Sequence, residues 1–482
     1  MSSVFAQPLA ALPDPLPLPG PSSHVVQADV TPPGSKSLTN RLVLLAALAT
    51  GESELRNPLI QADDAQRMLQ AVSALGAETS LADDPGGAPR LRIRGAGGRF
   101  RAPVGQSTTL DLGGSGTATR FLAAASVLAT SPVTLDGNPR MRQRPIGELA
   151  SALSQLGASV EHLGEAGFPP IRVTPPDELP ESPTVTLDAS RSSQFASALL
   201  MIGPFLPGGL TLRLTGAPAS APYLRMTGEL LHRFGAGVRT TDDLRVLRVS
   251  PPPARPQPGL DAFRIDIEPD ASGATYWWAA GALRAHTTIH VRGLPDTTTQ
   301  GDAAFTELLH RMGARVHRTG RNAPDPADHG VAVLAPVGVP IEPILADLSD
   351  MPDAAMTLAV VASFAKGRSI LRGLSTLRIK ETDRIAALQA ELAKIGVQIE
   401  TPVMGDTSAI TITPPDRGVD CSPNCPPVRF DTYDDHRMAM SLALVSLRRP
   451  NVFINDPACV AKTYPSFWQE FGRVLIPGDR AE

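Results

Sequence analysis

A glycine that follows an apolar residue recurs at intervals of about 80 residues, and this spacing constrains the fold more than any other feature of the chain. The six glycines are Gly76, Gly157, Gly235, Gly313, Gly396 and Gly472. Glycine just after the last apolar residue of a helix is the usual way for a helix to end. The sequence therefore predicts six copies of one structural repeat, each closing a helix at its glycine.

A second recurrence lies upstream of each glycine: a strand, a polar loop and then an apolar helix rich in small residues. The six loops are residues 34–37, 113–117, 190–194, 270–273, 351–353 and 433–437. Another strand and loop precede the glycine-terminated helix, so each repeat reads strand–helix–strand–helix–strand. The first helices, such as residues 195–202 and 355–364, are apolar nearly all round, which predicts burial. One repeat makes a poor core alone, so we expect an α/β fold with two lobes of three repeats, divided near residue 268.

Composition narrows the class of protein. The chain has 482 residues, of which 42% are hydrophobic, enough for two or three domains. A net charge of −4 and 4% aromatic residues give no basis for a nucleic-acid surface. The low number of cysteines, three, suggests a reducing compartment. Cys421 and Cys425 lie in a proline-rich loop without a second pair of ligands, so a zinc site is not expected there. Residues 1–23 are rich in Pro, Ala and Leu and are predicted to be a flexible leader. No stretch is apolar enough to span a bilayer, so a soluble, cytoplasmic protein is expected.

Residues 31–41 predict an anion site. A strand (25–30) is broken by proline and glycine, and a helix then starts with Ser35 or Ser37 as its N-cap. Free backbone amides, Lys36 and Arg41 therefore surround a helix N-terminus, where anions are favoured. Ordinary helix capping on a surface helix explains the same residues. Only five of the 44 basic residues are lysines, however, and three of them, Lys36, Lys380 and Lys462, fall in polar motifs.

Three further motifs in the first half of the chain suit anionic ligands. The glycine-rich turn 113–117 opens a helix that carries Arg120, and the loop 140–145 holds three arginines. Ser192, Ser193 and Gln194 begin the third buried helix, while Ser220 and Tyr223 flank a proline turn. A simple turn, a solvated charge run and helix capping are the respective structural alternatives.

The second half of the chain supplies carboxylates as well as cations. Asp353 begins an apolar helix, either as a cap or as a base that accepts a hydroxyl proton. Residues 378–384 are the densest charge cluster, and His436 and Lys462 lie in later loops. No second histidine stands at ligand spacing from His436, so no metal site is predicted. Together the motifs describe a cleft suited to two anionic small molecules and proton transfer. An open α/β solenoid that serves as a binding scaffold is the other interpretation.

At this point the chain resembles the 5-enolpyruvylshikimate-3-phosphate (EPSP) synthase family over residues 24–475. The resemblance is carried, in order, by Pro33–Ser37 with Asn40 and Arg41, Gly116–Ala118 with Arg120, Pro139–Met141 with Arg144 and Pro145, Ser192–Gln194, Pro352–Met356, Lys380–Arg384, Asp435–Arg437 and Ala461–Thr463. So many motifs in one order make a chance match implausible.

The resemblance implies a two-lobed inside-out α/β barrel of six βαβαββ repeats, with helices inside, sheets outside and the active site in the cleft between the lobes. Residues 35–268 would form one lobe, and residues 24–34 with 269–482 the other. The implied reaction transfers the enolpyruvyl group of phosphoenolpyruvate to the 5-hydroxyl of shikimate 3-phosphate. It releases phosphate, passes through a tetrahedral intermediate, belongs to aromatic amino acid biosynthesis and needs no cofactor. We expect a monomer that closes on these two substrates and binds neither nucleic acid nor membrane.

The resemblance also implies roles for individual residues. Asp353 would be the base, Glu381 the acid that protonates the methylene carbon, and Lys36 an aid to both steps. Shikimate 3-phosphate would be bound by Lys36, Ser37, Arg41, Ser192, Ser193, Ser220, Tyr223, Asp353 and Lys380. Phosphoenolpyruvate would be bound by Lys36, Gly116, Arg144, Gln194, Arg384, Arg437 and Lys462. Asp64, Arg120 and His436 would line the site.

Three positions depart from the family pattern. Gly114 stands where Asn is frequent, Phe121 where Pro or Leu is usual, and Thr376 where Asn is frequent. By the resemblance, these positions bear on the fine shape of the phosphoenolpyruvate pocket, where glyphosate competes in this family, and leave the reaction unchanged. The related UDP-N-acetylglucosamine enolpyruvyl transferase is an alternative, but its usual catalytic loop carries a cysteine and residues 139–148 have none. An inactive ligand-binding paralogue is the other alternative.

Overall fold

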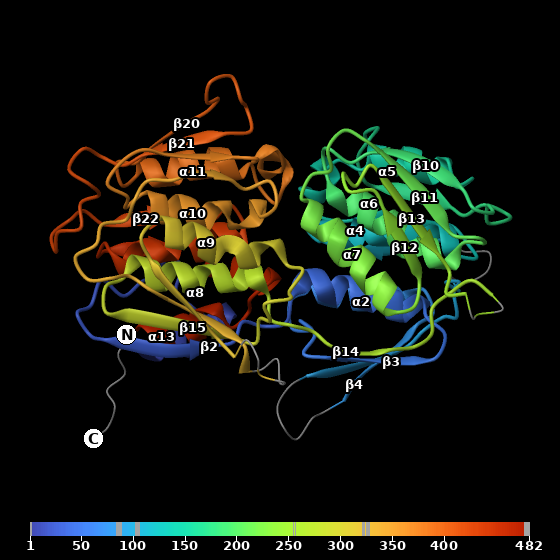
Figure 1. Cartoon of the computed structure of the whole chain (residues 1–482), viewed down its shortest axis with the longest axis horizontal. Coiled ribbons are helices and arrows are strands. Elements are labelled where there is room, and N and C mark those ends of the chain that lie inside the picture. The colour runs from blue at the N-terminus through green and yellow to red at the C-terminus, as the bar shows by residue number, and fades with distance from the viewer. Residues whose placement is uncertain are drawn as a thin grey trace. The chain divides into compact units, whose positions relative to one another are not determined.

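A computed structural model describes residues 2–82, 89–101, 107–253, 255, 257–320, 323 and 328–476 (Figure 1). The chain divides into two compact units. Unit 1 comprises residues 1–33 and 268–482, and unit 2 comprises residues 34–267. The divisions predicted from the sequence, at 34/35 and 268/269, lie one residue later.

The second repeat shows the common plan. Its elements are β6 (Thr108–Asp111), α4 (Gly116–Ala125), β7 (Val133–Asp136), α5 (Gly147–Ser154), β8 (Ser159–His162) and β9 (Ile171–Thr174). The sheet order is β6-β7-β9-β8, with β6 parallel to β7 and the other two pairs antiparallel. The first helix links two parallel strands, as a crossover connection requires.

The same plan is repeated through both units. Unit 2 also contains α2 (Lys36–Leu48), β3 (Glu52–Arg56), α3 (Asp63–Ala74), β4 (Glu78–Ala82), β5 (Arg90–Arg94), β10 (Thr184–Asp188), α6 (Ser193–Ile202), β11 (Leu210–Thr215), α7 (Ala221–Arg233), β12 (Gly237–Thr240), β13 (Val246–Ser250) and β14 (Arg264–Asp266). Unit 1 contains β2 (Val26–Val30), α8 (Ala271–Leu283), β15 (Thr287–Arg292), α9 (Phe305–Arg311), β16 (Arg315–Thr319), β17 (Gly330–Leu334), β18 (Leu345–Asp347), α10 (Ala355–Ala362), β19 (Ser369–Arg372), α11 (Arg384–Ala393), β20 (Gln398–Glu400), β21 (Ile410–Thr413), β22 (Val428–Phe430), α12 (His436–Ala443), β23 (Val452–Ile454) and α13 (Phe467–Leu475).

Two strands pair with a repeat that is distant in the chain. β2 precedes α2 in sequence but pairs with β15, in the register Val26 to Thr287 (Figure 1). β14 precedes α8 but pairs with β3, in the register Arg264 to Glu54. The first and fourth repeats therefore exchange their first strands. β2, which precedes α2, joins the sheet of the fourth repeat, and β14, which precedes α8, joins the sheet of the first repeat.

The first helix of every repeat is buried. All residues of α4, α8, α10 and α12 are buried, as are most of α2 and α6. The sheets lie on the outside of these helices, so each unit has one apolar core. The predicted α/β fold, with helices inside and sheets outside, is confirmed. The described strands form six separate sheets and no closed barrel. Among the described residues no helix combines the length and hydrophobicity needed to cross a membrane.

The expectation of a flexible leader over residues 1–23 differs from the structure. A short helix, α1 (Ser2–Phe5), places Phe5 at 2% exposure, and β1 (Leu16–Pro17) pairs antiparallel with β23. Leu16 and Leu18 are also buried. The prediction failed because it rested on the Pro, Ala and Leu content of the segment, which does not show that these apolar side chains find partners on unit 1 whose burial offsets the entropy lost.

The glycine pattern holds in five repeats and fails in the sixth. Gly76, Gly157, Gly235, Gly313 and Gly396 have positive φ angles at helix ends, as predicted. Gly472 instead lies inside α13. A Cβ atom there would lie 2.5 Å from Cβ of Phe5, so this glycine is needed for the close approach of α1 rather than to end a helix.

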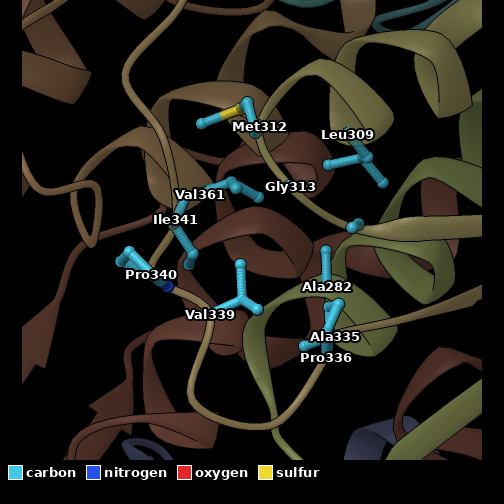
Figure 2. A pocket seen from close by; sticks show the side chains of 11 residues that line it. Ala282, Leu309, Met312, Gly313, Ala335, Pro336, Val339, Pro340, Ile341 and Val361 are labelled. Carbon is cyan, nitrogen blue, oxygen red and sulfur yellow. The ribbon is translucent and has the colours of Figure 1, made fainter.

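A small cavity of about 10 Å³ lies in unit 1 between α8, α9 and the segment 335–341 (Figure 2). Its lining is almost wholly aliphatic, including Leu309, Met312, Ile341 and Val361. It contains no charged side chain, so it is a packing defect and not a candidate for binding an anion.

Gly281 in α8 provides a test of this packing. A Cβ atom there would lie 2.3 Å from the carbonyl oxygen of Val333 in β17, whereas one at Gly273 in the same helix meets nothing closer than 3.5 Å. We expect Gly281→Ala to lower the free energy of unfolding by about 1–3 kcal/mol because the helix must move away from the sheet. Gly273→Ala should be neutral or stabilising. Urea unfolding of both variants measures this, and equal midpoints would contradict it.

Candidate active site

The N-terminus of α2 in unit 2 holds the first cation of the site. Ser35 caps the helix, its Oγ accepting a hydrogen bond from the amide of Leu38. Lys36 is the next residue, and its Nζ lies 3.6 Å from Oδ2 of Asp64, at the start of α3. The Lys36 side chain is 13% exposed and that of Asp64 2%. The ammonium is thus held at a helix N-terminus and remains accessible.

Arg41 is buried one turn further along α2. Its guanidinium donates to Oγ1 of Thr227 at 2.8 Å, to Oγ of Ser197 at 3.1 Å and to the carbonyl oxygens of Ser37 and Tyr223. These partners on α2, α6 and α7 are all uncharged. Burial lowers the pKa of Arg41 to about 10, because no carboxylate among these partners offsets the loss of hydration. The arginine fixes three helices to one another and leaves a positive charge near their N-terminal ends.

Gly116, the first residue of α4, allows two more arginines to approach the backbone. A Cβ atom there would lie 2.4 Å from Nη1 of Arg120 and 2.5 Å from Nη2 of Arg144. Arg120 donates to the carbonyl oxygens of Gly116 and Pro145, and Arg144 donates to that of Gly114 at 3.3 Å. A side chain at this position would have to displace both guanidinium groups, so glycine lets them lie against the start of α4.

Gln194 connects this turn to α6. Its Oε1 accepts from Nη1 of Arg120 at 3.1 Å, and its Nε2 donates to Oγ1 of Thr117 at 3.3 Å. Ser192 caps α6 through the amide of Gln194. Ser193 is buried directly after it.

Ser220 and Tyr223 belong to the same end of unit 2. Ser220 has a left-handed backbone (φ 56°) and is the N-cap residue of α7. Strain of this kind is retained where surrounding contacts fix the conformation. The ring of Tyr223 faces the Arg41 guanidinium, with 5.6 Å from Cζ to the ring centroid.

Unit 2 therefore gathers one cluster at the N-termini of α2, α4 and α6. The predicted site residues that it brings into this part of the unit are Lys36, Ser37, Arg41, Asp64, Gly116, Arg120, Arg144, Ser192, Ser193, Gln194, Ser220 and Tyr223. Cations and helix N-termini predominate over the single carboxylate, so the cluster suits a phosphate or a carboxylate. The loop 140–145 contributes only in part: Arg142 pairs with Asp136 at 2.7 Å and is half exposed.

In unit 1 the central residue is Arg384, the first residue of α11, which is 1% exposed. Its guanidinium donates to three carboxylates: Asp435 at 2.7 and 3.2 Å, Asp353 at 3.0 Å and Glu381 at 2.9 Å. The five N–H donors of one planar guanidinium allow Arg384 to serve all three carboxylates at once.

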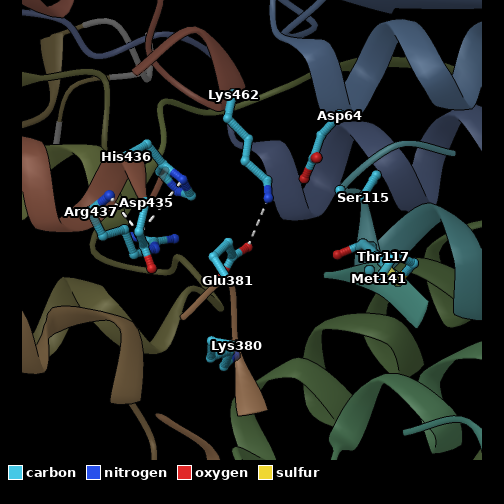
Figure 3. A network of polar contacts seen from close by, with 12 residues as sticks. Asp64, Ser115, Thr117, Met141, Lys380, Glu381, Asp435, His436, Arg437 and Lys462 are labelled. Atoms are coloured by element: carbon cyan, nitrogen blue, oxygen red, sulfur yellow. Dashed lines mark hydrogen bonds and ion pairs between the residues drawn. The ribbon is translucent and has the colours of Figure 1, made fainter. Parts of the chain in front are cut away.

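The two candidate catalytic carboxylates each contact further cations. Asp353 Oδ1 lies 3.5 Å from Nζ of Lys380, and its Oδ2 lies 3.1 Å from Nη2 of Arg437. Glu381 Oε1 lies 3.3 Å from Nζ of Lys462, drawn as a dashed line in Figure 3. Both side chains are mostly buried, at 13% and 9% exposure. Asp353 thus contacts three cations and Glu381 two.

The N-terminus of α12 completes the cluster. Asp435 caps the helix by accepting a hydrogen bond from the amide of Arg437 at 2.9 Å (Figure 3). The same carboxylate accepts from Arg384 at 2.7 Å, so it fixes both that guanidinium and the start of α12. His436 is fully buried, with Nδ1 3.9 Å from Asp435. The predicted residues that unit 1 brings together are Asp353, Lys380, Glu381, Arg384, His436, Arg437 and Lys462.

Sequence reasoning did not select Asp302 as a site residue. It is fully buried, accepts a hydrogen bond from the hydroxyl of Ser272 and senses the charges of Asp353 and Arg437. Burial, aided by the negative charge of Asp353, raises the pKa of Asp302 to about 7. The signal in the sequence was an acidic residue in the second loop of the fourth repeat, where other repeats also carry charge.

In the described part of the chain, no group of three or more His, Cys, Asp or Glu side chains is arranged to hold a metal ion.

Comparison with known proteins identifies the family of the chain. The model for EPSP synthase (3-phosphoshikimate 1-carboxyvinyltransferase) matches residues 22–471. The chain belongs to the EPSP synthase family. Proteins named 3-phosphoshikimate 1-carboxyvinyltransferase are similar to it: the one from Nitrosomonas europaea is 40% identical over 94% of this chain and 97% of its own length, and the one from Laribacter hongkongensis is 41% identical over 92% and 96%.

Solved structures support the fold. An EPSP synthase from Acinetobacter baumannii aligns with a TM-score of 0.74 over 95% of this chain and 97% of its own, at 24% identity. An enolpyruvyl transferase from Streptomyces tendae aligns with a TM-score of 0.68 over 96% and 98%, at 16% identity. The resemblance inferred from the motifs is confirmed, and the UDP-N-acetylglucosamine enzyme is not favoured.

The three departures from the family pattern lie in or near the clusters. Gly114 offers the carbonyl oxygen that Arg144 contacts. Phe121 is fully buried, with its ring 5.2 Å from Cζ of Arg41, so it stabilises that cation through its π face. Thr376 is 8% exposed, and its hydroxyl has no hydrogen-bond partner among the described residues.

Arg384→Met tests the central position of the guanidinium. We expect it to lower the free energy of unfolding by about 3–5 kcal/mol, because three mostly buried carboxylates lose a shared cation. The control is Arg378→Met, which removes a pair with Asp383 that is more than one-third exposed on both sides and should cost about 1 kcal/mol or less. Urea unfolding at pH 7 compares the two. Similar losses in both variants would contradict the role of Arg384.

Asp302→Asn tests the buried carboxyl. The folded pKa of about 7 exceeds the ordinary value of 3.8, so between those values the folded chain binds a proton that the unfolded chain lacks. Stability is therefore present below pH 4 and lost as pH rises through 7. The asparagine variant should match the native protein near pH 4 and exceed it by up to about 4 kcal/mol at pH 8. Unfolding curves across this range, with exposed Asp242→Asn as control, measure it; a constant difference would contradict it.

Proposed function

We propose that the chain transfers the enolpyruvyl group of phosphoenolpyruvate to the 5-hydroxyl of shikimate 3-phosphate and releases phosphate. The supporting observation is that Asp353 and Glu381 share the Arg384 guanidinium while each contacts a different lysine. Two carboxylates in distinct surroundings are what a reaction with separate base and acid requires. Family membership supports the identity of the substrates.

The cation-rich cluster of unit 2 is proposed to bind anionic groups of both substrates. Lys36, Ser37, Arg41, Ser192, Ser193, Ser220 and Tyr223 would bind shikimate 3-phosphate, with Asp353 and Lys380 from unit 1. Gly116, Arg144, Gln194 and Lys36 would bind phosphoenolpyruvate, with Arg384, Arg437 and Lys462 from unit 1. Asp64, Arg120 and His436 would position these groups.

Asp353 is proposed to accept the proton of the attacking hydroxyl. Its ionised form is favoured by Lys380, Arg384 and Arg437, so it is ready to act as a base. The hydroxyl oxygen then bonds to C2 of the enol while C3 receives a proton, giving a tetrahedral phosphate adduct. Loss of phosphate and of one methyl proton restores the carbon–carbon double bond, so protons balance overall.

Glu381 is proposed to deliver the proton to C3, for which it must first be protonated. In the structure its charge is balanced by Arg384 and Lys462. The phosphate and carboxylate of phosphoenolpyruvate compete for those cations, and a carboxylate that loses its cations gains affinity for a proton. Substrate binding would thus convert Glu381 from a salt-bridge partner into an acid.

The remaining expectations belong to the same proposal. The enzyme is proposed to act in the cytoplasm as a monomer on two small-molecule substrates, without a cofactor. An inactive ligand-binding paralogue is the competing function. It predicts binding of shikimate 3-phosphate without phosphate release.

The deciding experiment supplies both substrates and measures phosphate release and product mass. Asp353→Asn and Glu381→Gln should each lower turnover by about 10²–10⁴, the usual contribution of a general acid or base. Asp350→Asn, an exposed neighbour, is the matched control and should retain turnover. A loss below threefold in either variant would remove that residue from the mechanism. Binding of both substrates without any product would favour the paralogue.

Lys36→Arg tests whether the site needs a compact ammonium. The wider guanidinium cannot occupy the position 3.6 Å from Asp64 without displacing neighbours at the α2 N-terminus. We expect turnover to fall at least tenfold although the charge is kept. Lys366→Arg, in a half-exposed pair with Glu342, is the control and should be neutral. Near-normal turnover of Lys36→Arg would refute the requirement.

A further inference from the structure

We infer that residues 2–18, which precede the part of the chain matched by the family, position Lys462 for its contact with Glu381. The family match covers residues 22–471, and this segment lies before it. In the structure it packs along the elements that carry Lys462 in the sixth repeat. The inference rests on the proposed role of Lys462 in binding phosphoenolpyruvate.

The segment first completes the sheet of the sixth repeat. In the other five sheets a strand that follows the second helix pairs antiparallel with the second strand. In the sixth, β1 takes that place beside β23, pairing Leu16 with Ile454 and Pro17 with Phe453. The amide of Leu18 adds a hydrogen bond to the carbonyl of Val452 at 2.9 Å. β23 is thereby flanked on both sides, which fixes where the following loop begins.

The segment next holds the start of the helical turn that ends in Lys462. This turn, η10 (Pro457–Lys462), begins after Asp456, whose backbone is left-handed (φ 45°). The amide of Asp456 donates to Oδ1 of Asp14 at 3.0 Å. A strained residue keeps its conformation only when its surroundings impose it, and Asp14 supplies such a contact. The short helix η1 (Leu9–Ala11) also packs against η10.

The segment finally packs on α13, which follows η10. Phe5 lies against Gly472, with the two rings of Phe5 and Phe471 6.2 Å apart. α13 is tied back to η10 because Nε1 of Trp468 donates to the carbonyl oxygen of Pro457 at 2.8 Å. The segment therefore holds the start of η10 in two ways: directly, through Asp14 and Asp456, and indirectly, through α13 and Pro457.

Lys462 is the last residue of η10, and its Nζ lies 3.3 Å from Oε1 of Glu381. A shift of η10 by a few tenths of an ångström changes this distance directly. Since the lysine is proposed to bind phosphoenolpyruvate, loosening residues 2–18 should weaken the binding of phosphoenolpyruvate and leave that of shikimate 3-phosphate unchanged. Asp14 and Phe5 are positioning residues, because neither contacts the reacting groups.

Two substitutions test the inference while keeping the chain intact. Asp14→Ala removes the acceptor for the Asp456 amide, and Asp14→Asn retains an oxygen at that place. Phe5→Ala removes the packing on Gly472. We expect Asp14→Ala and Phe5→Ala to raise the KM for phosphoenolpyruvate about three- to tenfold, the effect of losing one such contact. The KM for shikimate 3-phosphate should stay within twofold, and Asp14→Asn should restore most of the affinity.

A matched destabilised variant separates positioning from general stability. Val249→Ala in the core of unit 2 lowers stability away from the segment and should leave both KM values unchanged. Hydrogen exchange of the amides of residues 456–463 supplies a readout independent of activity. Exchange there should be at least tenfold faster in Asp14→Ala and Phe5→Ala than in the native chain and in Val249→Ala.

Unchanged exchange at residues 456–463, or equal changes of both KM values, would overturn the inference. The test is distinct from that of the proposed function. If the native chain released no phosphate, the proposed function would fail, while faster exchange would still show that residues 2–18 hold η10. If turnover were present and the variants left KM and exchange unchanged, only the inference would fail.

Discussion

The Arg384 guanidinium is the interaction on which the chemistry of unit 1 depends. It is buried at the start of α11 and binds Asp353, Glu381 and Asp435, which come from three different loops. Bringing three carboxylates together without a cation would be prohibitive, since each would repel the others in a medium of low dielectric. One planar fork of donors removes that cost and also sets the distances between the proposed base and the proposed acid.

The repeat architecture determines where such charges can lie. The first helix of each repeat is largely apolar and enclosed by its unit, so a charge on it must be paired. The charged side chains of these helices, such as Arg41, Arg120 and Arg437, lie in the first two turns, and helix N-terminal ends attract anions. In unit 2, many cations and a single carboxylate lie at those ends, which suits the binding of anionic groups. Unit 1 balances cations against carboxylates, which suits proton transfer.

The sequence predicted local features well and long-range partners poorly. Five glycines end helices as expected, and the polar loops begin buried helices because N-caps and helix C-caps are local signals. It could not show that Arg41 joins α2, α6 and α7 through uncharged partners, nor that Asp302 is fully buried beside Ser272. Those depend on residues far apart in the chain. Residues 1–23 were misjudged for the same reason, since Leu16 pairs with Ile454.

The failure of the glycine pattern at Gly472 has its own physical meaning. In the other repeats the glycine ends a helix, whereas in the sixth repeat Gly472 lies inside α13 and allows Phe5 to pack against that helix. A larger residue at position 472 would push Phe5 away from α13. Gly472 and Phe5 must therefore be compatible as a pair. The sixth repeat obtains its third strand, β1, from the N-terminal segment. The position of η10, which ends in Lys462, therefore depends on a segment that lies before residues 22–471, the part of the chain that the family model matches.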